Sequence, residues 1–121
     1  MMALDDMVDT YCAARNAAEA AERNRLLRVA WTADGRYSDP MVRDLDRAAL
    51  VAHIGVLLER FPGSTIRRTT VIDSHHAGLR FGFVRLAADG SVMREGVDIC
   101  QLGEAGRLHR ITGFFGVLQA L

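Results

Sequence analysis

The pattern of apolar positions changes along the chain, from helical spacing in the first half to strand spacing in the second. The first apolar stripe predicts an amphipathic helix from residue 3 to about residue 16, with Tyr11 on its apolar face. Its members are Leu4, Met7, Val8, Tyr11 and Ala14. A second predicted helix, over about 18–32, is rich in alanine and arginine and ends before the turn residues Asp34 and Gly35. Its apolar side carries Leu27, Ala30 and Trp31.

A short strand and a third helix follow. Residues 36–39 predict the strand. Asp44 or Asp46 is expected to cap the helix, which runs to about Arg60 and is terminated by the Pro62-Gly63 pair. The apolar stripe of this helix consists of Leu50, His53, Ile54, Leu57 and Leu58, followed by Phe61.

From residue 64 onward the period is that of strands. Turn signals at residues 75–78, 89–90 and 103–106 divide this segment into four antiparallel strands joined by three hairpins. Helices followed by a strand meander predict one α+β domain over residues 1–121, with a curved antiparallel sheet wrapped round the helices. A chain of 121 residues buries roughly two thirds of its unfolded surface around one core.

The hairpin loops predict the strand register around Asp98. A two-residue loop at 89–90 pairs Asp98 with Phe81, and a loop at 104–105 pairs it with Ile111 on its other side. Asp98 then shares a face with Leu79, Phe81, Phe83, Ile111 and Phe115. The opposite face is a mixture suited to a subunit contact or to partial exposure: Arg80, Val84, Ile99, Arg110, Thr112 and Phe114.

Composition narrows the class of partner. The 15 basic residues balance the 15 acidic ones, so no electrostatic argument favours nucleic acid or an anionic membrane, and a small or apolar partner is expected. No apolar run reaches the ~20 residues that span a bilayer, and residues 1–6 are acidic where a secretory signal is basic, which predicts a cytoplasmic location. Cys12 and Cys100 lack metal spacing and indicate small core residues in a reducing compartment.

Three polar residues are candidates for chemistry in an apolar interior. Asp98 stands in mid-strand among phenylalanines, where an unpaired charge costs several kcal/mol, so a pocket role is favoured over a structural one. Asp39, before Pro40, has two interpretations: a proton shuttle, or a turn cap that accepts backbone hydrogen bonds. Tyr11 faces the core in either case, and its hydroxyl needs a partner there.

Other residue types indicate less specific roles. His53 lies on the apolar stripe of the third helix, as either a core histidine or a pocket residue. His75 and His76 fall at a hairpin end, where at most one of them faces inward, and no acid or third histidine at ligand spacing suggests a metal. Several aromatic residues are available to fill the core or line a cavity: Trp31, Tyr37, Phe61, Phe81, Phe83, Phe114 and Phe115. Neither a nucleophile elbow nor a glycine-rich phosphate loop is present in the sequence, so no cofactor is predicted.

The order of three helices, a short strand after the second and a long four-strand meander resembles the nuclear transport factor 2-like superfamily, in particular its SnoaL-like polyketide cyclase branch. The resemblance covers nearly the whole chain and rests on Tyr11, Trp31 and residues 37–40, 61–63, 75–76, 80–83, 96–98, 106–108 and 111–116. It implies a cone-shaped α+β barrel of the nuclear transport factor 2-like or cystatin-like type, with the three helices in the concavity of the sheet. Because this scaffold serves isomerases, cyclases, dehydratases, epoxide hydrolases and proteins without chemistry, the resemblance implies the fold more specifically than the reaction.

Ketosteroid isomerases of this superfamily carry functional residues at positions that resemble Tyr11, Asp39 and Asp98. The resemblance implies that Asp39 moves a proton between carbons next to a carbonyl, while Tyr11 and a protonated Asp98 donate hydrogen bonds to the developing enolate. In the epoxide hydrolases of this fold an arginine pairs with acids to activate water. The predicted register puts Arg80 on the face opposite Asp98, which argues against that reaction.

We therefore expect a SnoaL-like domain, homodimeric through its sheet, with an apolar pocket for a small hydrophobic carbonyl compound such as a polyketide or steroid. If the protein is an enzyme, we expect acid–base chemistry of the isomerase or cyclase type by Asp39, Asp98 and Tyr11. The substrate-binding wall is expected to contain Trp31, Tyr37, His53, Phe61, Phe81, Phe83 and Phe115. The alternative is a non-catalytic ligand-binding or dimerisation module of the same fold, and the presence or absence of a cavity beside Asp98 separates the two.

Overall fold

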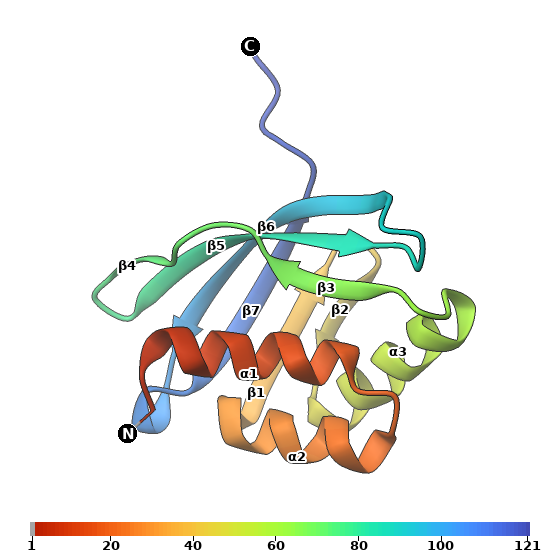
Figure 1. Cartoon of the computed structure of the whole chain (residues 1–121). Coiled ribbons are helices and arrows are strands. Elements are labelled where there is room, and N and C mark those ends of the chain that lie inside the picture. The colour runs from red at the N-terminus through yellow and green to blue at the C-terminus, as the bar shows by residue number, and fades with distance from the viewer. Residues whose placement is uncertain (1) are drawn as a thin grey trace.

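The computed structural model describes residues 2–121, in which three helices pack against one curved sheet (Figure 1). No helix in this part of the chain is long and apolar enough to cross a membrane. The elements, in chain order, are α1 (Leu4–Asn16), α2 (Ala20–Ala30), β1 (Trp31–Asp39), β2 (Val42–Leu45), α3 (Arg47–Arg60), β3 (Thr65–Arg68), β4 (Asp73–His75), β5 (Gly78–Leu86), β6 (Val92–Leu102) and β7 (Leu108–Phe115). A 3₁₀ turn, Glu104–Gly106, connects β6 to β7.

The three helices begin and end close to the predicted positions. The first turn of α1 carries Asp5 and Asp6 and its last turn carries Arg15, an arrangement that complements the helix dipole. Of the two cap candidates for α3, Asp46 is the one used, since its Oδ1 accepts a hydrogen bond from the Ala49 N–H at 2.9 Å. The end of α1 is joined to β3 by Asn16, whose side-chain amide pairs with the N–H and C=O of Ile66 at 2.7 and 2.9 Å.

The buried side chain of Arg23 holds the helices together. Its guanidinium donates to three backbone carbonyls, those of Ala17 at 2.9 Å, Ala18 at 2.8 Å and Val51 at 3.1 Å. One arginine thereby joins α2 to α3 and to the loop between α1 and α2. Hydrogen bonds to carbonyl dipoles satisfy a buried guanidinium without a carboxylate.

Within the described residues the sheet has seven strands, in the order β2-β1-β7-β6-β5-β3, with β4 also paired to β5. The meander strands pair antiparallel, as predicted, but the sheet as a whole is mixed, because β1 runs parallel to β7. The predicted second helix is also too long: it ends at Ala30, and Trp31 opens a strand that reaches Asp39. Trp31 pairs with Leu108 of β7, so a long-range pairing outweighs the local helical pattern.

The first strand of the predicted meander is divided in two. Both halves, β3 and β4, pair antiparallel with β5, and the chain leaves the ladder between them. At the break the Thr70 side chain replaces the backbone ladder, since its Oγ1 accepts the hydrogen bond of the Gly82 N–H at 2.8 Å. The turns predicted at residues 89–90 and 103–106 are confirmed, since they connect β5 to β6 and β6 to β7.

The register around Asp98 is confirmed on one side and wrong on the other. Asp98 pairs with Phe81 of β5, as predicted, but with Gly113 of β7 instead of Ile111. The 3₁₀ turn and a register shift between Gln101 and Leu102 lengthen the connection and move the pairing by two residues. Because side chains alternate with a period of two, the same residues still face inward.

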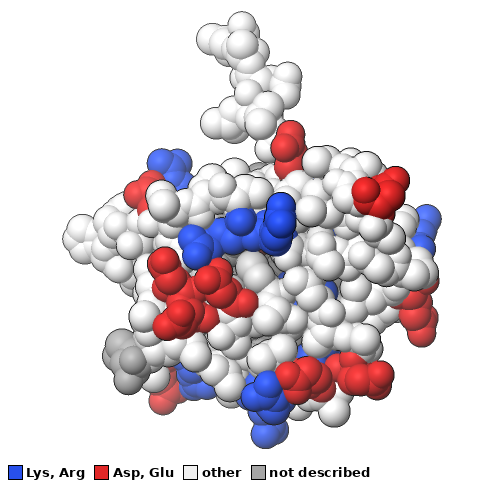
Figure 2. Space-filling model, viewed as in Figure 1, with Lys and Arg blue, Asp and Glu red and all other residues white. Residues whose placement is uncertain are grey.

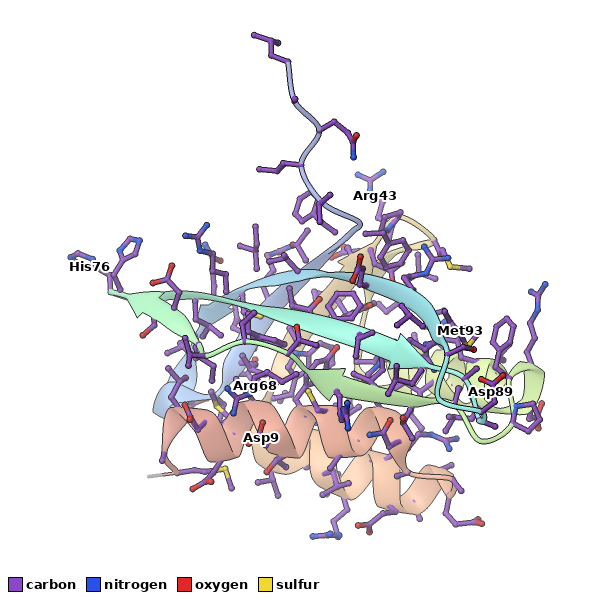
Figure 3. The ribbon with its side chains drawn as sticks, turned by 45° about the horizontal axis from the view of Figure 1, so that its top comes forward. Asp9, Arg43, Arg68, His76, Asp89 and Met93 are labelled. Carbon is purple, nitrogen blue, oxygen red and sulfur yellow. The ribbon has the colours of Figure 1, made fainter. Side chains whose placement is uncertain are left out.

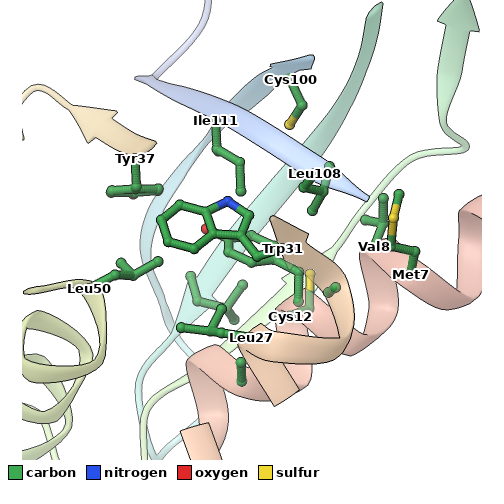
Figure 4. Close-up of a cluster of buried hydrophobic side chains, with 14 of the residues drawn as sticks. Met7, Val8, Cys12, Leu27, Trp31, Tyr37, Leu50, Cys100, Leu108 and Ile111 are labelled. Carbon is green, nitrogen blue, oxygen red and sulfur yellow. The ribbon is translucent and has the colours of Figure 1, made fainter. Parts of the chain in front are cut away.

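The inner face of the sheet and the helices enclose one hydrophobic core. Trp31 is fully buried near its centre and is surrounded by side chains that include Leu27, Leu50, Leu108 and Ile111 (Figure 4). On the outer face, Ile99 and Phe114 are 48% and 54% exposed, as the predicted mixed face requires, whereas Val84 of the same predicted set is buried. Beyond β7 the C-terminal residues extend away from the body of the protein (Figure 1).

Charged side chains of both signs are interspersed on the face that carries α1 (Figure 2). The clearest contact there joins α1 to β3: Arg68 donates to Asp9 at 3.0 Å and lies 3.8 Å from Asp5, and Figure 3 shows Arg68 beside Asp9. A mixed surface agrees with the balanced composition and gives no extended field of one sign on this face.

Candidate functional site

A cavity of about 260 Å³ lies between α3, the end of α1 and the inner face of the sheet. Its lining runs from exposed side chains such as Met41, 59% exposed, to deeply buried ones such as Asp98, 6% exposed, so it connects solvent to the interior. Met93, also on the lining, lies at the β5–β6 end of the sheet (Figure 3). The lining residues are Arg15, Tyr37, Asp39, Met41, His53, Leu57, Arg60, Phe61, Ile66, Phe83, Arg85, Met93, Arg94, Asp98 and Phe115.

Asp98 is the buried acid of this cavity. β6 carries it between Phe81 and Gly113, with its carboxyl directed to the inner face. No side chain or backbone group of residues 2–121 forms a hydrogen bond or an ion pair with it. Desolvation by burial raises the pKa of Asp98 to about 7, with Arg15 acting in the opposite direction and Asp39 adding to the increase. The carboxyl is therefore divided between its acid and base forms near neutral pH.

Tyr37 and Asp39 form a hydrogen-bonded pair on β1. The Tyr37 hydroxyl donates to Asp39 Oδ2 at 2.6 Å, while Asp39 Oδ1 accepts from the backbone N–H groups of Met41 at 2.7 Å and Val42 at 3.1 Å. The two backbone bonds to Oδ1 confirm the turn-capping interpretation of Asp39, and its other oxygen, Oδ2, is occupied by Tyr37. Burial raises the pKa of the Tyr37 hydroxyl, against an opposing effect of Arg15. Tyr37 thus stays protonated at neutral pH.

Gly113 lies where the buried acid and the tyrosine–aspartate pair come close to β7. A Cβ atom at this residue would lie 3.0 Å from Asp98 Oδ1, 3.3 Å from Asp39 Cβ and 3.7 Å from the Tyr37 hydroxyl oxygen. The first two distances are shorter than ordinary van der Waals contacts, so a side chain at residue 113 would crowd the Asp98 carboxyl. The glycine therefore allows Asp98 and Asp39 to approach this strand closely.

Two arginines that the sequence interpretation did not single out also line the cavity. Arg15, at the end of α1, is 5% exposed, and its guanidinium carbon lies 5.1 Å from the centre of the Tyr37 ring. Arg85, on β5, is 7% exposed and donates to Ser64 Oγ at 3.0 Å. The periodicity contained a signal for each: Arg15 follows Tyr11 by four residues on the apolar face of a helix, and Arg85 follows Phe83 by two residues on a strand.

His53 is a further polar group on the cavity wall. Its Nε2 is buried and has no hydrogen-bond partner among residues 2–121. Desolvation lowers the pKa of His53, and the nearby Arg15 lowers it further, so the ring is neutral at pH 7.

The other residues predicted for the site divide into two groups. The first group lies on the cavity wall and consists of Tyr37, Asp39, His53, Phe61, Phe83, Asp98 and Phe115. Tyr11, Trp31 and Phe81, by contrast, are at most 2% exposed and belong to the core cluster instead of the lining. Tyr11 remains electrostatically close to Asp98 and Arg15, and burial raises the pKa of its hydroxyl. The tyrosine that borders the cavity beside the two acids is thus Tyr37.

Residues outside the cavity offer little chemistry. His75 and His76 are exposed at the β4–β5 turn, and Figure 3 shows His76 at that end of the sheet. Among the described residues no group of three or more histidine, cysteine or acidic side chains is arranged to hold a metal ion. Cys12 and Cys100 are buried free thiols, and burial raises the pKa of Cys12 to about 12. Arg80 is exposed and pairs with Asp73 at 2.8 Å on the outer face, which confirms its predicted separation from Asp98.

The three helices and the curved sheet define the class of protein: an α+β barrel of the nuclear transport factor 2-like type, with a cavity on the inner face of the sheet. No protein family model and no curated protein sequence matches the chain. Solved structures do. A proposed isomerase of the SnoaL-like family from Agrobacterium tumefaciens strain C58 is 28% identical, with a TM-score of 0.84 over 93% of this chain and 96% of that one.

Two proposed polyketide cyclases are similar in fold alone. The one from Sinorhizobium meliloti is 13% identical, with a TM-score of 0.69 over 93% of this chain and 99% of that one. The SnoaL-like one from Jannaschia sp. CCS1 is 14% identical, with a TM-score of 0.65 over 92% of this chain and 85% of that one. These neighbours confirm the resemblance to SnoaL-like and nuclear transport factor 2-like proteins that the sequence predicted.

Proposed function

We propose that the protein catalyses proton transfer on a small hydrophobic carbonyl compound, as an isomerase or cyclase that needs no cofactor, with Asp98 as the proton-transfer group. The observation that carries this proposal is a carboxyl group 6% exposed, without a hydrogen bond or ion pair within residues 2–121, on the wall of a cavity. Its pKa of about 7 suits a group that must both accept and return a proton at neutral pH.

The chemistry follows from the two forms of Asp98. As a carboxylate, it removes a proton from a carbon next to the substrate carbonyl, and the electron pair of the broken C–H bond forms an enolate. As the resulting acid, it returns the proton to another carbon of the conjugated system, which completes an isomerisation. In a cyclase the enolate carbon instead attacks a second carbonyl of the same molecule, and the acid protonates the new alkoxide.

Tyr37 and Asp39 are proposed to position the substrate. Asp39 already accepts three hydrogen bonds, which hold it in place and make it an acceptor for Tyr37 more than a mobile base. Because the Tyr37 hydroxyl donates its proton to Asp39, its oxygen is left as an acceptor for an O–H group of the substrate. This assignment differs from the one that the ketosteroid isomerase resemblance implies, in which Asp39 moves the proton and Tyr11 is a donor.

The similarity to a proposed isomerase at 28% identity supports a reaction of this type, and the fold neighbours include proposed polyketide cyclases. The test is exchange of carbon-bound hydrogen in deuterated buffer, followed by NMR for a panel of enolisable ring ketones and enones. We expect exchange with at least one compound, and a loss of about 10²-fold or more in Asp98→Asn, the usual effect of removing a general acid–base. Binding without exchange in the wild-type protein would favour the non-catalytic binding module.

Tyr37→Phe is the matched variant for the positioning role. It removes one hydroxyl and leaves the ring that faces Arg15 in place. We expect a smaller loss of exchange rate than in Asp98→Asn, with an increase in KM. An unchanged rate and KM would remove Tyr37 from the site.

We also propose that the protein forms a homodimer through the outer face of the sheet. Ile99 and Phe114 expose about half of their surface there, next to basic and hydroxyl side chains. Apolar residues on a sheet face are commonly covered by a partner. Light scattering that gives a monomeric mass at high concentration would exclude this arrangement.

A further inference from the structure

We infer that the substrate is an acid: an apolar ring compound that carries a carboxylate group, which Arg15 and Arg85 bind inside the cavity. The inference rests on the proposed function, because it assigns the substrate class of the same site. It follows from the charges of the cavity wall, which the proton-transfer proposal does not use.

Arg15 is a buried cation with an unsatisfied N–H donor. Its side chain is 5% exposed and lines the cavity, and its Nη1 is buried without any hydrogen bond from residues 2–121. No carboxylate of this part of the chain lies within ion-pair distance of it. A buried charge is ordinarily paired, since an unpaired one loses its hydration without compensation.

Arg23 is a buried arginine with a structural role, and its hydrogen bonds provide a comparison for Arg15. It is 6% exposed, like Arg15, but donates to three backbone carbonyls at 2.8–3.1 Å. Arg23 is not part of the cavity lining, whereas Arg15 is. The unfilled donor is thus found at the site where a ligand has access to it.

Arg85 adds a second cation to the same wall. It is 7% exposed and has one hydrogen bond, to the neutral Ser64 hydroxyl, so its charge is not compensated either. Burial lowers the pKa of Arg85, and the positive charge of Arg15 lowers it further. An anion that binds between two guanidinium groups offsets their mutual repulsion and accepts charge-assisted hydrogen bonds from both.

The acids already present do not fill this role. Both oxygens of Asp39 accept hydrogen bonds from Tyr37 and from the backbone, and Asp98 is partly neutral near pH 7. Nearer the exposed side, Arg60 stacks 5.5 Å from the centre of Phe61 and Arg94 stacks 3.9 Å from that of Phe115. Four arginines therefore face the cavity against two acids, which favours the entry of an anion.

The chemical class of the ligand follows from shape as well as charge. A guanidinium presents its N–H groups as a planar fork that matches a carboxylate. The remaining wall is apolar and aromatic, with Leu57, Phe61, Ile66, Phe83 and Phe115. A volume of about 260 Å³ is just below the roughly 300 Å³ at which typical ligand pockets begin. A ring acid of one or two rings suits this space better than a four-ring steroid or polyketide.

Matched acid and amide pairs test the inference, because each pair differs in charge but hardly in shape. We would measure binding by calorimetry at pH 7.5 for benzoate and benzamide, cinnamate and cinnamamide, and 2-naphthoate and 2-naphthamide. We expect at least one acid to bind roughly tenfold or more tighter than its amide, as hydrogen bonds to charged groups provide. The preference should disappear in Arg15→Met and in Arg85→Met, and should persist in Arg25→Met, which alters an exposed arginine paired with Glu22 on α2.

Equal binding of acid and amide in every pair, or no binding of any acid, overturns the inference. A preference that survives in both Arg15→Met and Arg85→Met does the same. If Arg15→Met fails to fold, Arg15→Lys takes its place in the test, because lysine keeps the positive charge but lacks the planar guanidinium. This variant should retain only part of the preference for the acid. Asp98→Asn separates this inference from the proposed function: it should abolish hydrogen exchange and keep the preference for the acid.

Discussion

Replacing Asp98 with asparagine should make the protein more stable above neutral pH, even though it removes the proposed proton-transfer group. Asparagine has nearly the same shape but carries no charge, so the substitution removes the cost of ionising a carboxyl that is buried without a hydrogen-bond partner among residues 2–121. Functional groups in cavities commonly reduce stability in this way.

The magnitude follows from linkage. Burial raises the pKa of Asp98 from 3.8 to about 7, so the folded protein holds this proton more tightly than the unfolded chain does. The contribution to stability is fully present below about pH 4 and is lost as the pH rises through 7. At about 1.4 kcal/mol per pKa unit, the loss is about 4 kcal/mol in total, of which about 3 kcal/mol falls between pH 5 and pH 8.

Urea unfolding of wild type and Asp98→Asn at pH 5 and pH 8 measures this difference, because all other titrating groups are shared and cancel. We expect the free energy of unfolding of the variant, relative to wild type, to increase by about 3 kcal/mol between the two pH values. Asp73→Asn is the control: it removes an exposed carboxylate paired with Arg80, a contact worth about 1 kcal/mol or less. A difference between wild type and Asp98→Asn that is the same at both pH values would refute the buried, unpaired state of Asp98.

Three further predictions concern the cavity, the helix contacts and the outer face. Gly113→Ala places a methyl group 3.0 Å from the Asp98 carboxyl and crowds it, so hydrogen exchange should fall while circular dichroism and urea unfolding show a folded protein; an unchanged exchange rate would show that the reaction tolerates a shift of this carboxyl. Arg23→Met removes three hydrogen bonds to backbone carbonyls and should lower the free energy of unfolding by about 3 kcal/mol in urea, since the carbonyls lose a charged donor; a loss below about 1 kcal/mol would contradict this role. Phe114→Glu, on the exposed outer face, should halve the mass found by light scattering if the dimer proposal holds, and an unchanged dimer would place the interface elsewhere.

Local chemistry was sufficient to predict much of the fold. Helical spacing identified α1 and α3, the two cap candidates Asp44 and Asp46 indicated where α3 begins, and a turn signal at residues 89–90 predicted the pairing of Phe81 with Asp98. These features depend on residues near one another in sequence, or on a tight hairpin that carries a register from one strand to the next. The inward direction of Asp98 followed from the same alternation.

Long-range pairing decided the rest of the fold. The Trp31 segment reads as the end of a helix, yet it forms a strand because β7, 77 residues later at Leu108, offers it a partner. No local pattern reveals a parallel neighbour at that separation. The longer β6–β7 connection likewise moved the partner of Asp98 from Ile111 to Gly113, and so placed a residue without a side chain next to the acid.

The sequence by itself determined that an acid, Asp98, faces an apolar interior, because strand alternation and hairpin register are local properties. Only the tertiary structure decided which groups meet it there. It brought Tyr37 to the cavity and left Tyr11 in the core, and it directed Arg15 and Arg85 to the same wall from elements far apart in the chain. The physical reason is that the charge environment of a buried acid is set by distances between helices and strands, which no spacing along the chain encodes.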